Sequence, residues 1–387
     1  MRTVNPSIVI GSYGWDQDRV PRDEFQLRID ALNRVMDQNH WKAVLVYGDM
    51  AEHSALAYFS NFTPRLRWGM ALLPRKGDPR LLVSMSPRDI PAMRLMTWIP
   101  DVHSGWNWPS VFDPWLAKLD TEGAADIGTV GFDMMRPPLF TSLQQSLGNR
   151  FRLQDGDAQV AACRTPRPRA RSLIRAASSL AAETADVFRQ SWVSGKGVEA
   201  AALDAERAAR LRAAQDVRML TSHDGGRTLV PFRGSLGPAP GGLAAYIAVK
   251  HMGYWGDVFV SEGHALQPAV ESALDAILAS AAPDVMGAVL HAKAIEALSR
   301  EALSRTALNS HALHPVLSGS VGNRIGYSPD EGGRLTQDSA DMLKIGDTYS
   351  LQVGAHDAGG GAFASAMVAI TSKGYDLVHR STAPKKS

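Results

Sequence analysis

His251-Met252-Gly253-Tyr254-Trp255-Gly256-Asp257 is the stretch around which the second half of the chain is organised. It lies inside Leu243 to Val260, where apolar and β-branched residues around a glycine predict a turn and a strand. The next segment, Pro268 to Ala281, has the length and apolar spacing of a helix. A strand region followed by a helix is therefore the first unit that this half of the chain predicts.

Further helices and strands are predicted on both sides of this unit. Upstream, Ser172 to Val193 predicts an Ala-rich helix and Gly197 to Leu220 a second one. Downstream, Gly287 to Leu303 predicts a helix, followed by strands over Thr348 to Gly354 and Phe363 to Thr371. This order predicts two related halves that pack pairs of helices on one curved sheet.

The first part of the chain alternates helical and strand patterns of a different kind. Asp23 to Asn39 has apolar residues at helical spacing, and the run Ala43 to Tyr47 is short and apolar, as a buried strand is. Gly69 to Leu73 and Arg80 to Ser84 predict two strands joined by a turn over Lys76 to Pro79. We therefore predict an N-terminal α/β domain over residues 1–160.

Between the two parts lies a basic, proline-broken run, Cys163-Arg164-Thr165-Pro166-Arg167-Pro168-Arg169. Proline disrupts a helix interior and the like charges repel, so we predict a linker over residues 161–170 and a C-terminal domain over residues 171–387. The alternative, a nucleic-acid patch, is disfavoured because no aromatic residues are interleaved with the charges.

Composition excludes several classes of protein. The 387 residues carry 41 Lys and Arg against 39 Asp and Glu, which argues against nucleic acid as a partner. The single cysteine, Cys163, cannot form an internal disulfide, and this fits a cytoplasmic protein. No run approaches the roughly 18 apolar residues of a membrane span, so no membrane association is expected.

Several pieces of the chain resemble the creatinase, prolidase, aminopeptidase P and methionine aminopeptidase family. Their order and spacing, rather than any one of them, make the resemblance specific. The pieces are Arg28-Ile29-Asp30-Ala31-Leu32, Tyr47-Gly48-Asp49, the stretch 251–257 quoted above, Gly322-Asn323-Arg324-Ile325-Gly326-Tyr327, Lys344-Ile345-Gly346-Asp347, Tyr349-Ser350-Leu351-Gln352 and Ile370-Thr371-Ser372-Lys373-Gly374-Tyr375. The resemblance implies a C-terminal pita-bread domain, of α+β architecture with pseudo-twofold halves, behind a creatinase-like N-terminal α/β domain.

Metal-dependent members of this family hold two divalent ions with five ligands: two Asp, one His and two Glu. Counted along the matching pieces, these positions fall on Tyr246, Asp257, Asn323, Gln352 and Ser365, so only Asp257 keeps a ligand type. One carboxylate cannot hold a dinuclear site, and Arg324 would repel cations. We therefore predict neither metal nor other cofactor, as in creatinase; the position of the catalytic histidine of creatinase falls on Leu229.

The expected pocket region contains several groups that could move a proton. His251 and His356 are candidates because imidazole titrates near neutral pH, and the sequence leaves open which of them acts. Asp257 and Glu331 could orient a water molecule or the leaving nitrogen. These four residues are the predicted catalytic set.

Arginines suggest an anionic substrate, because guanidinium binds carboxylate through paired hydrogen bonds. Arg65 and Arg67 resemble the region from which creatinase reaches into the pocket of a neighbouring subunit, which implies a homodimer, but which arginine reaches is left open. The full predicted binding set is Arg65, Arg67, Arg233, Tyr254, Asn323, Arg324, Asp330, Arg334 and Gln352.

Together these features predict a metal-independent, creatinase-like hydrolase or lyase, acting on a C–N bond of a small carboxylate-bearing molecule. One alternative is a non-catalytic, peptidase-like binding module whose ligand is a peptide. Another is an Xaa-Pro aminopeptidase-type metallopeptidase, which would require the ligand positions to be miscounted at four places.

Overall fold

The computed structural model describes residues 14–119, 124–164, 167–231, 242–304 and 313–381. The chain forms two compact units, Met1–Thr165 and Pro166–Ser387. Within the predicted linker over residues 161–170, α7 ends at Cys163 and α8 begins at Pro168. Proline is compatible with the first turn of a helix, where its missing N–H would have no partner.

The N-terminal unit, unit 1, is built on a mixed six-stranded sheet with strand order β4-β3-β2-β1-β5-β6. The β1–β2 and β2–β3 pairs are antiparallel, and β1–β5, β3–β4 and β5–β6 are parallel. The strands are β1 (Trp41–Asp49), β2 (Trp68–Pro74), β3 (Arg80–Val83), β4 (Asp101–Ser104), β5 (Ala125–Val130) and β6 (Phe151–Asp155). The strands predicted over residues 43–47, 69–73 and 80–84 are thus confirmed.

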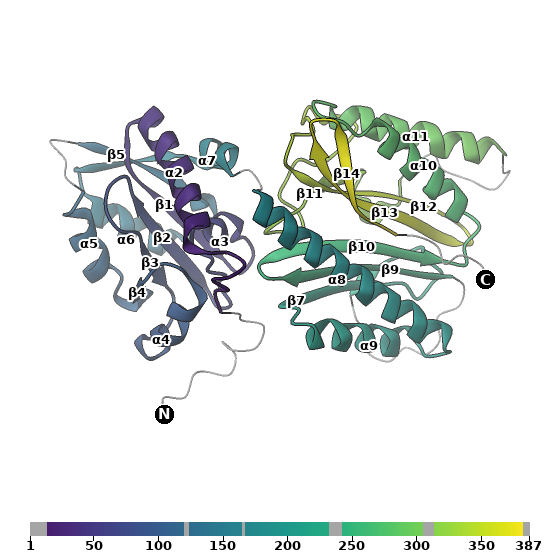
Figure 1. Ribbon diagram of the computed structural model, residues 1–387, viewed down its shortest axis with the longest axis horizontal. Coiled ribbons are helices and arrows are strands. Elements are labelled where there is room, and N and C mark those ends of the chain that lie inside the picture. Colours follow the sequence, from purple (N-terminus) through teal and green to yellow (C-terminus); the bar gives the residue numbers. More distant parts are fainter. Residues whose placement is uncertain (1–13, 120–123, 165–166, 232–241, 305–312, 382–387) are drawn as a thin grey trace. The chain divides into compact units, whose positions relative to one another are not determined.

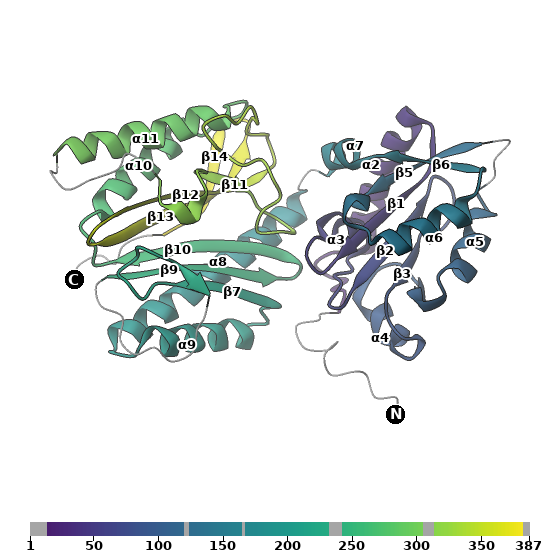
Figure 2. The same ribbon diagram turned by 180° about the vertical axis from the view of Figure 1, so that it is seen from behind.

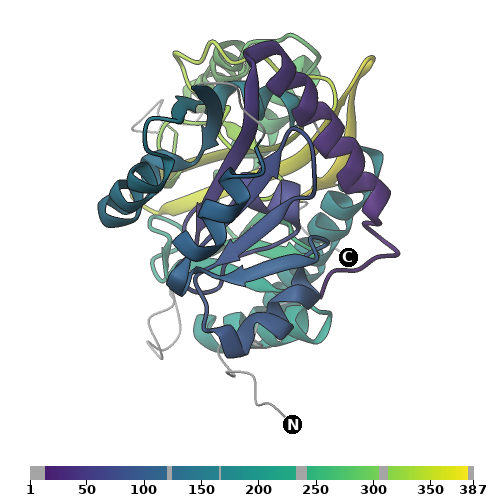
Figure 3. The same cartoon turned by 90° about the vertical axis from the view of Figure 1, so that its left-hand side faces the viewer.

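Helices cover both faces of this sheet (Figure 3). Buried residues of α5 and α6 pack on one face, and α2, α3 and α7 lie on the other. The helices are α2 (Arg22–Asn39), α3 (Ser54–Ser60), α4 (Ile90–Met93), α5 (Pro109–Leu116), α6 (Pro137–Leu147) and α7 (Asp157–Cys163), with 3-10 turns η1 (Pro87–Asp89), η2 (Arg94–Met96), η3 (Gly105–Asn107) and η4 (Phe132–Met134).

The C-terminal unit, unit 2, contains two four-stranded sheets, ordered β10-β9-β7-β8 and β11-β12-β13-β14 (Figure 2). The predicted single curved sheet is therefore divided, although β10 and β13 lie side by side and the Phe259 N–H donates to the Ser365 hydroxyl at 2.9 Å. The elements are α8 (Pro168–Val193), α9 (Val198–Leu211), β7 (Asp216–Thr221), β8 (Val230–Pro231), β9 (Leu243–His251), β10 (Tyr254–Glu262), α10 (Gln267–Ser280), α11 (Gly287–Ser304), η5 (Pro315–Leu317), β11 (Gly322–Arg324), β12 (Thr348–Asp357), β13 (Gly360–Thr371) and β14 (Gly374–Arg380).

One helix prediction in unit 2 is too long. The helix predicted over Gly197 to Leu220 ends at Leu211, and Asp216–Thr221 instead forms β7, which pairs with β9. The chain leaves the helix through Ala213, which has a positive φ of 63°. Backbone pairing with β9 outweighs the helix propensity of this segment.

Strand alternation in unit 2 separates an apolar face from a polar one. On β9 and β10, Ile247 and Val258 belong to the core under α8 and α9. The residues immediately before them, Tyr246 and Asp257, point to the opposite face of the sheet. On β12, Leu351 and its alternate neighbours pack against α10 and α11. The opposite faces of both sheets are thus free to form a site.

Among the residues that the structure describes, no helix is long and apolar enough to cross a membrane.

Candidate active site

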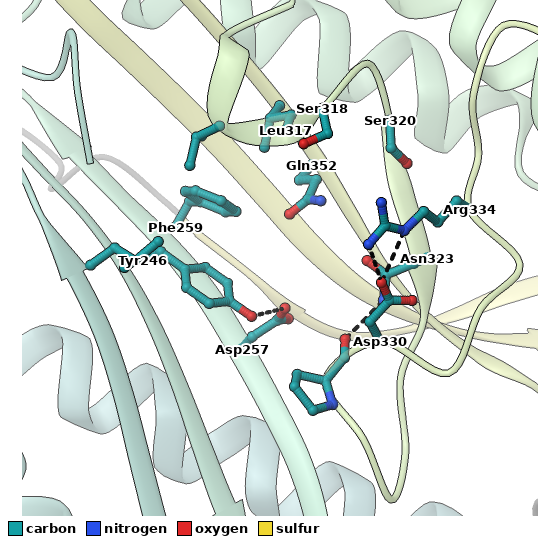
Figure 4. Close-up of a pocket in the computed structure, with 13 residues that line it drawn as sticks. Tyr246, Asp257, Phe259, Leu317, Ser318, Ser320, Asn323, Asp330, Arg334 and Gln352 are labelled. Atoms are coloured by element: carbon teal, nitrogen blue, oxygen red, sulfur yellow. Dashed lines mark hydrogen bonds and ion pairs between the residues drawn. The ribbon is translucent and has the colours of Figure 1, made fainter. Parts of the chain in front are cut away.

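A cavity of about 230 Å³ lies between the inner faces of the two sheets of unit 2 (Figure 4). Its walls come from β7, β9, β10, β11, β12 and the segments around η5 and residues 329–334. The lining residues are Leu220, Tyr246, Asp257, Phe259, Val316, Leu317, Ser318, Ser320, Asn323, Pro329, Asp330, Arg334 and Gln352. The cavity therefore combines an apolar side with a concentrated set of polar groups.

Asp257 supplies the buried carboxylate of the cavity, and its side chain is only 4% exposed. The Tyr246 hydroxyl donates to its Oδ2 at 3.1 Å, while the buried Oδ1 makes no hydrogen bond within the described part of the chain. Burial raises the pKa of the Asp257 carboxyl to about 6, and the nearby hydroxyls of Ser350 and Tyr246 offset this only in part. Asp257 can therefore both accept and donate a proton near neutral pH.

Tyr246 remains a proton donor to this carboxylate. Burial and the neighbouring Asp257 raise the pKa of the Tyr246 phenol well above its usual value. The neutral phenol is a single O–H donor, and that donor is used by Asp257. Together, Tyr246 and Asp257 form a hydrogen-bonded pair brought together by two adjacent antiparallel strands.

Two amides extend the polar side of the cavity. Both Nδ2 protons of Asn323 are used, by the carbonyls of Arg324 and Pro329 at 2.8 Å each, so the amide oxygen is what Asn323 can offer a ligand. Gln352 lies on β12, and its side chain makes no hydrogen bond to the residues that the structure describes. Gln352 can therefore both donate to and accept from a bound molecule.

An ion pair lies on the more exposed side of the cavity. Nε and Nη2 of Arg334 donate to Asp330 Oδ2 at 2.9 and 2.6 Å, and the two side chains are 58% and 39% exposed. The charges of Arg334 and Asp330 compensate each other, so with Asp257 also in the lining the cavity has no net positive charge.

By sequence, the chain matches no protein-family model and no curated protein. By structure, it resembles the prolidase of Pyrococcus horikoshii OT3, with a TM-score of 0.74, 16% identity, and 92% of this chain and 99% of that one covered. An X-Pro aminopeptidase of Thermotoga maritima MSB8 matches with a TM-score of 0.70 at 17% identity, covering 91% and 98%.

The chain has the prolidase fold. The resemblance found in the sequence is thereby confirmed for the fold class, including the N-terminal α/β part. The N-terminal domain of a FACT complex subunit from chickpea (Cicer arietinum) shares this fold, with a TM-score of 0.66 at 14% identity over 92% and 96% of the two chains. The prolidase fold therefore occurs both in peptidases and in a subunit of a complex.

Within this prolidase fold, four of the five counted ligand positions line the cavity: Tyr246, Asp257, Asn323 and Gln352. The fifth, Ser365, lies opposite Gln352 in the β12–β13 pair, but its hydroxyl accepts the N–H of Phe259. The sequence count thus identified positions that the fold brings together.

The residues present do not fit the metal pair that the resemblance implies. Asp257 is the one carboxylate at these positions, and its neighbours are a neutral phenol and two amides. Over the described ranges, no group of three or more His, Cys, Asp or Glu side chains is arranged to hold a metal ion. Two divalent ions need several carboxylates in contact with them, so this donor set is unsuitable.

Glu331 and Arg324 do not line the cavity. Glu331 Oε1 accepts the backbone N–H groups of Tyr327 and Ser328 at 2.7 and 3.3 Å. Arg324 donates to the Glu331 carbonyl at 2.9 Å and lies 3.7 Å from Asp347. In these contacts, both side chains organise their own loop and do not contribute to the cavity.

The two candidate histidines and Tyr254 also lie outside the cavity lining. His251 ends β9, and its register partner Tyr254 begins β10, where the Tyr254 hydroxyl is bonded to that of Tyr327 at 2.6 Å. His356 lies near the end of β12 with its ring 5.2 Å from that of His314. The proton-transfer role expected of the histidines therefore has no geometric support at this cavity.

The remaining arginines belong elsewhere. Arg65 and Arg67 precede β2 in unit 1, with Arg67 exposed and in a left-handed conformation with φ of 54°. Arg233 lies outside the described residues.

Sequence reasoning missed the wall formed by Val316, Leu317, Ser318 and Ser320. Ser318-Gly319-Ser320 is a run of small residues typical of a turn, and this run was the one sequence feature that could have pointed to the wall. Ser318 and Gly319 both have positive φ, of 49° and 73°. Such backbone geometry in a residue other than glycine is concentrated at functional sites.

Proposed function

We propose that unit 2 is a metal-independent hydrolase or lyase that acts on a C–N bond of a small molecule by general acid/base catalysis at Asp257. The observation that supports this most is the buried Tyr246–Asp257 pair in the cavity, with the pKa of Asp257 raised to about 6. A carboxyl with that pKa is suited to proton transfer near neutral pH.

In the hydrolytic form of the reaction, ionised Asp257 accepts a proton from water as the water oxygen bonds to the substrate carbon. The protonated carboxyl then gives this proton to the nitrogen as the C–N bond breaks, which leaves Asp257 ionised again. In the lyase form, Asp257 instead takes a proton from the carbon next to the C–N bond, and the electron pair of that C–H bond forms a C=C double bond as the C–N bond breaks. Asp257 then gives the proton to the departing nitrogen and is ionised again. Tyr246 keeps its hydroxyl on Oδ2 throughout and holds the carboxylate in position.

The size of the cavity and its charged groups support our proposal of a small, carboxylate-bearing substrate. A volume of about 230 Å³ is below the roughly 300–1,000 Å³ of pockets for drug-sized ligands, which favours a small molecule. Asp257 favours a nitrogen at the buried end. Arg334 lines the more exposed side, where Nη1 is not used by Asp330, so we infer that a substrate carboxylate binds there.

The test is turnover of a panel of Xaa-Pro dipeptides and small amidino or N-acyl carboxylates, followed by detection of the released amine. We expect Asp257→Asn to lower kcat by about 100-fold or more on any substrate found. Metal-depleted protein is expected to retain full activity. Restoration of activity only by added divalent ions would contradict the proposal.

A second candidate, a non-catalytic binding module, is favoured by one observation: neither histidine proposed for proton transfer lines the cavity. In that case Asp257→Asn alters ligand affinity while no member of the panel is consumed. Calorimetric titration with the same panel, alongside the turnover assay, separates the two functions.

A further inference from the structure

The apolar and hydroxyl-bearing wall of the cavity is a short segment, in which Leu317 is buried against Ala244, Phe259 and Phe363. Val316, Leu317 and Ser318 come from η5 and the residue after it (Figure 4). A 3-10 turn of this length has little intrinsic stability, so its position depends on what anchors its ends. The residue at its N-terminal end is His314, which is 2% exposed.

The ring of His314 makes hydrogen bonds from both nitrogens. Nε2 lies 3.0 Å from the Gly226 carbonyl and 2.9 Å from the Arg227 carbonyl, so Nε2 carries the proton. Nδ1 accepts the backbone N–H of Val316 at 3.2 Å and caps η5. This pattern requires the neutral ring, and burial lowers the pKa of His314, which favours that form.

The groups that His314 contacts are themselves held in place. The Gly226 N–H donates to the Ser222 hydroxyl at 2.7 Å, and the Gly225 carbonyl accepts the Gly361 N–H at 2.9 Å. The backbone N–H of His314 donates to the Gly354 carbonyl on β12 at 2.8 Å. His314 therefore joins the cavity wall to the β7–β8 connection and to β12.

We propose that His314 is a positioning residue that fixes the wall of Val316, Leu317 and Ser318 across the cavity from Asp257 and so determines how tightly the substrate is held. Its ring does not line the cavity, so it acts through the wall and not on the reacting atoms. The inference rests on the function proposed above. Ser318 is the exposed hydroxyl that this wall presents to the cavity.

Three substitutions separate the contacts of His314. His314→Leu removes all three side-chain hydrogen bonds, His314→Gln retains a donor for the two carbonyls, and His314→Asn retains an acceptor for the Val316 N–H. In hydrogen exchange without any ligand, we expect the amides of Val316, Leu317, Ser318 and Ser320 to exchange at least about tenfold faster in the Leu variant. The Gln and Asn variants should each restore part of the protection.

Turnover of the substrate found in the panel then distinguishes positioning from general stability. We expect His314→Leu to raise KM about tenfold or more with kcat changed less than about threefold, and His314→Gln to recover part of the loss. Leu274→Ala, in the core between α10 and the β12 sheet, is the control for destabilisation.

Unchanged exchange of the wall amides in His314→Leu would overturn the proposal, as would an equal rise of KM in Leu274→Ala. The exchange result does not depend on turnover. If Asp257→Asn keeps full activity, the proposed function fails while the exchange experiment still decides whether His314 holds the wall.

Discussion

The position of Asp257 in the site could be predicted from the sequence, but its burial and its pKa could not. Its place in the chain was recognisable from the spacing around Gly253 and Tyr254. Its pKa is raised by burial, and the hydroxyls of Tyr246 and of Ser350 on β12 oppose that rise. Burial comes from distant segments, so a count along the chain could not provide it.

Ionised Asp257 is expected to cost stability. A carboxyl whose folded pKa is about 6, against an ordinary 3.8, binds its proton more tightly when folded. The stabilisation of the folded state by protonated Asp257 is therefore complete below about pH 3.8 and is lost as the pH rises through about 6. We expect Asp257→Asn to increase the free energy of unfolding at pH 7.5 by about 2–3 kcal/mol.

Urea denaturation from pH 4 to pH 7.5 checks this expectation. The stability difference between the variant and the wild-type protein should grow across this range and level off above about pH 6. A constant difference would show that Asp257 does not titrate with a raised pKa.

Tyr246→Phe should move the pH dependence of activity in a definite direction. The hydroxyl favours the ionised carboxylate, so its removal raises the pKa of Asp257 further above 6. The acidic limb of the pH profile of kcat/KM should shift to higher pH, with lower activity at pH 7. Tyr349→Phe, which removes a hydroxyl that bonds the Met342 carbonyl, is the matched control and should leave the limb unchanged.

At the scale of elements, periodicity predicted α2, α10 and α11 close to their observed bounds, whereas it led to no prediction for α3 to α7, β4 to β6 or β14. The predictions that were wrong have a common cause. The end of α9 and the start of β7 were decided by pairing with β9, and the loop roles of Glu331 and Arg324 by backbone groups that local sequence does not reveal. Contacts between elements outweighed local preference in each case.

The close approach of α8 to β10 predicts a sensitive position at Gly256. A methyl group there would overlap the backbone nitrogen of Ser178 and lie 2.6 Å from the carbonyl carbon of Ala177. Backbone atoms cannot yield as a flexible side chain can. We expect Gly256→Ala to destabilise unit 2 by about 2–4 kcal/mol, measured by denaturant unfolding.

Gly14→Ala is the control for this substitution, because its added methyl would meet an ordinary 3.6 Å contact with the Leu95 carbonyl. It should change stability by less than about 0.5 kcal/mol. Equal effects of the two substitutions would argue against tight packing of α8 on β10.

At the scale of the whole molecule, the expectation that a neighbouring subunit completes the pocket remains a proposal. It can be tested with two variants, Asp257→Asn and the double variant Arg65→Ala, Arg67→Ala. If an arginine serves the neighbouring site, each variant alone is inactive, whereas mixed and reassociated dimers should recover about a quarter of wild-type activity.

Sedimentation of each variant checks that it forms dimers, and recovery of differently tagged subunits in one complex checks that the subunits exchange. Activity no greater than the sum of the separate variants would show that Arg65 and Arg67 do not complete a neighbouring site. Retained activity in the double arginine variant alone would exclude them from the site altogether.

By itself, the sequence determined the prolidase-like order of helices and strands and the positions that correspond to a site, because hydrophobic periodicity and motif spacing are local properties of the chain. Only the tertiary structure decided which of those positions meet in one cavity. It also decided that Asp257 is buried, that Arg334 is paired with Asp330 and that His314 holds a wall. These outcomes depend on contacts between segments far apart in the sequence.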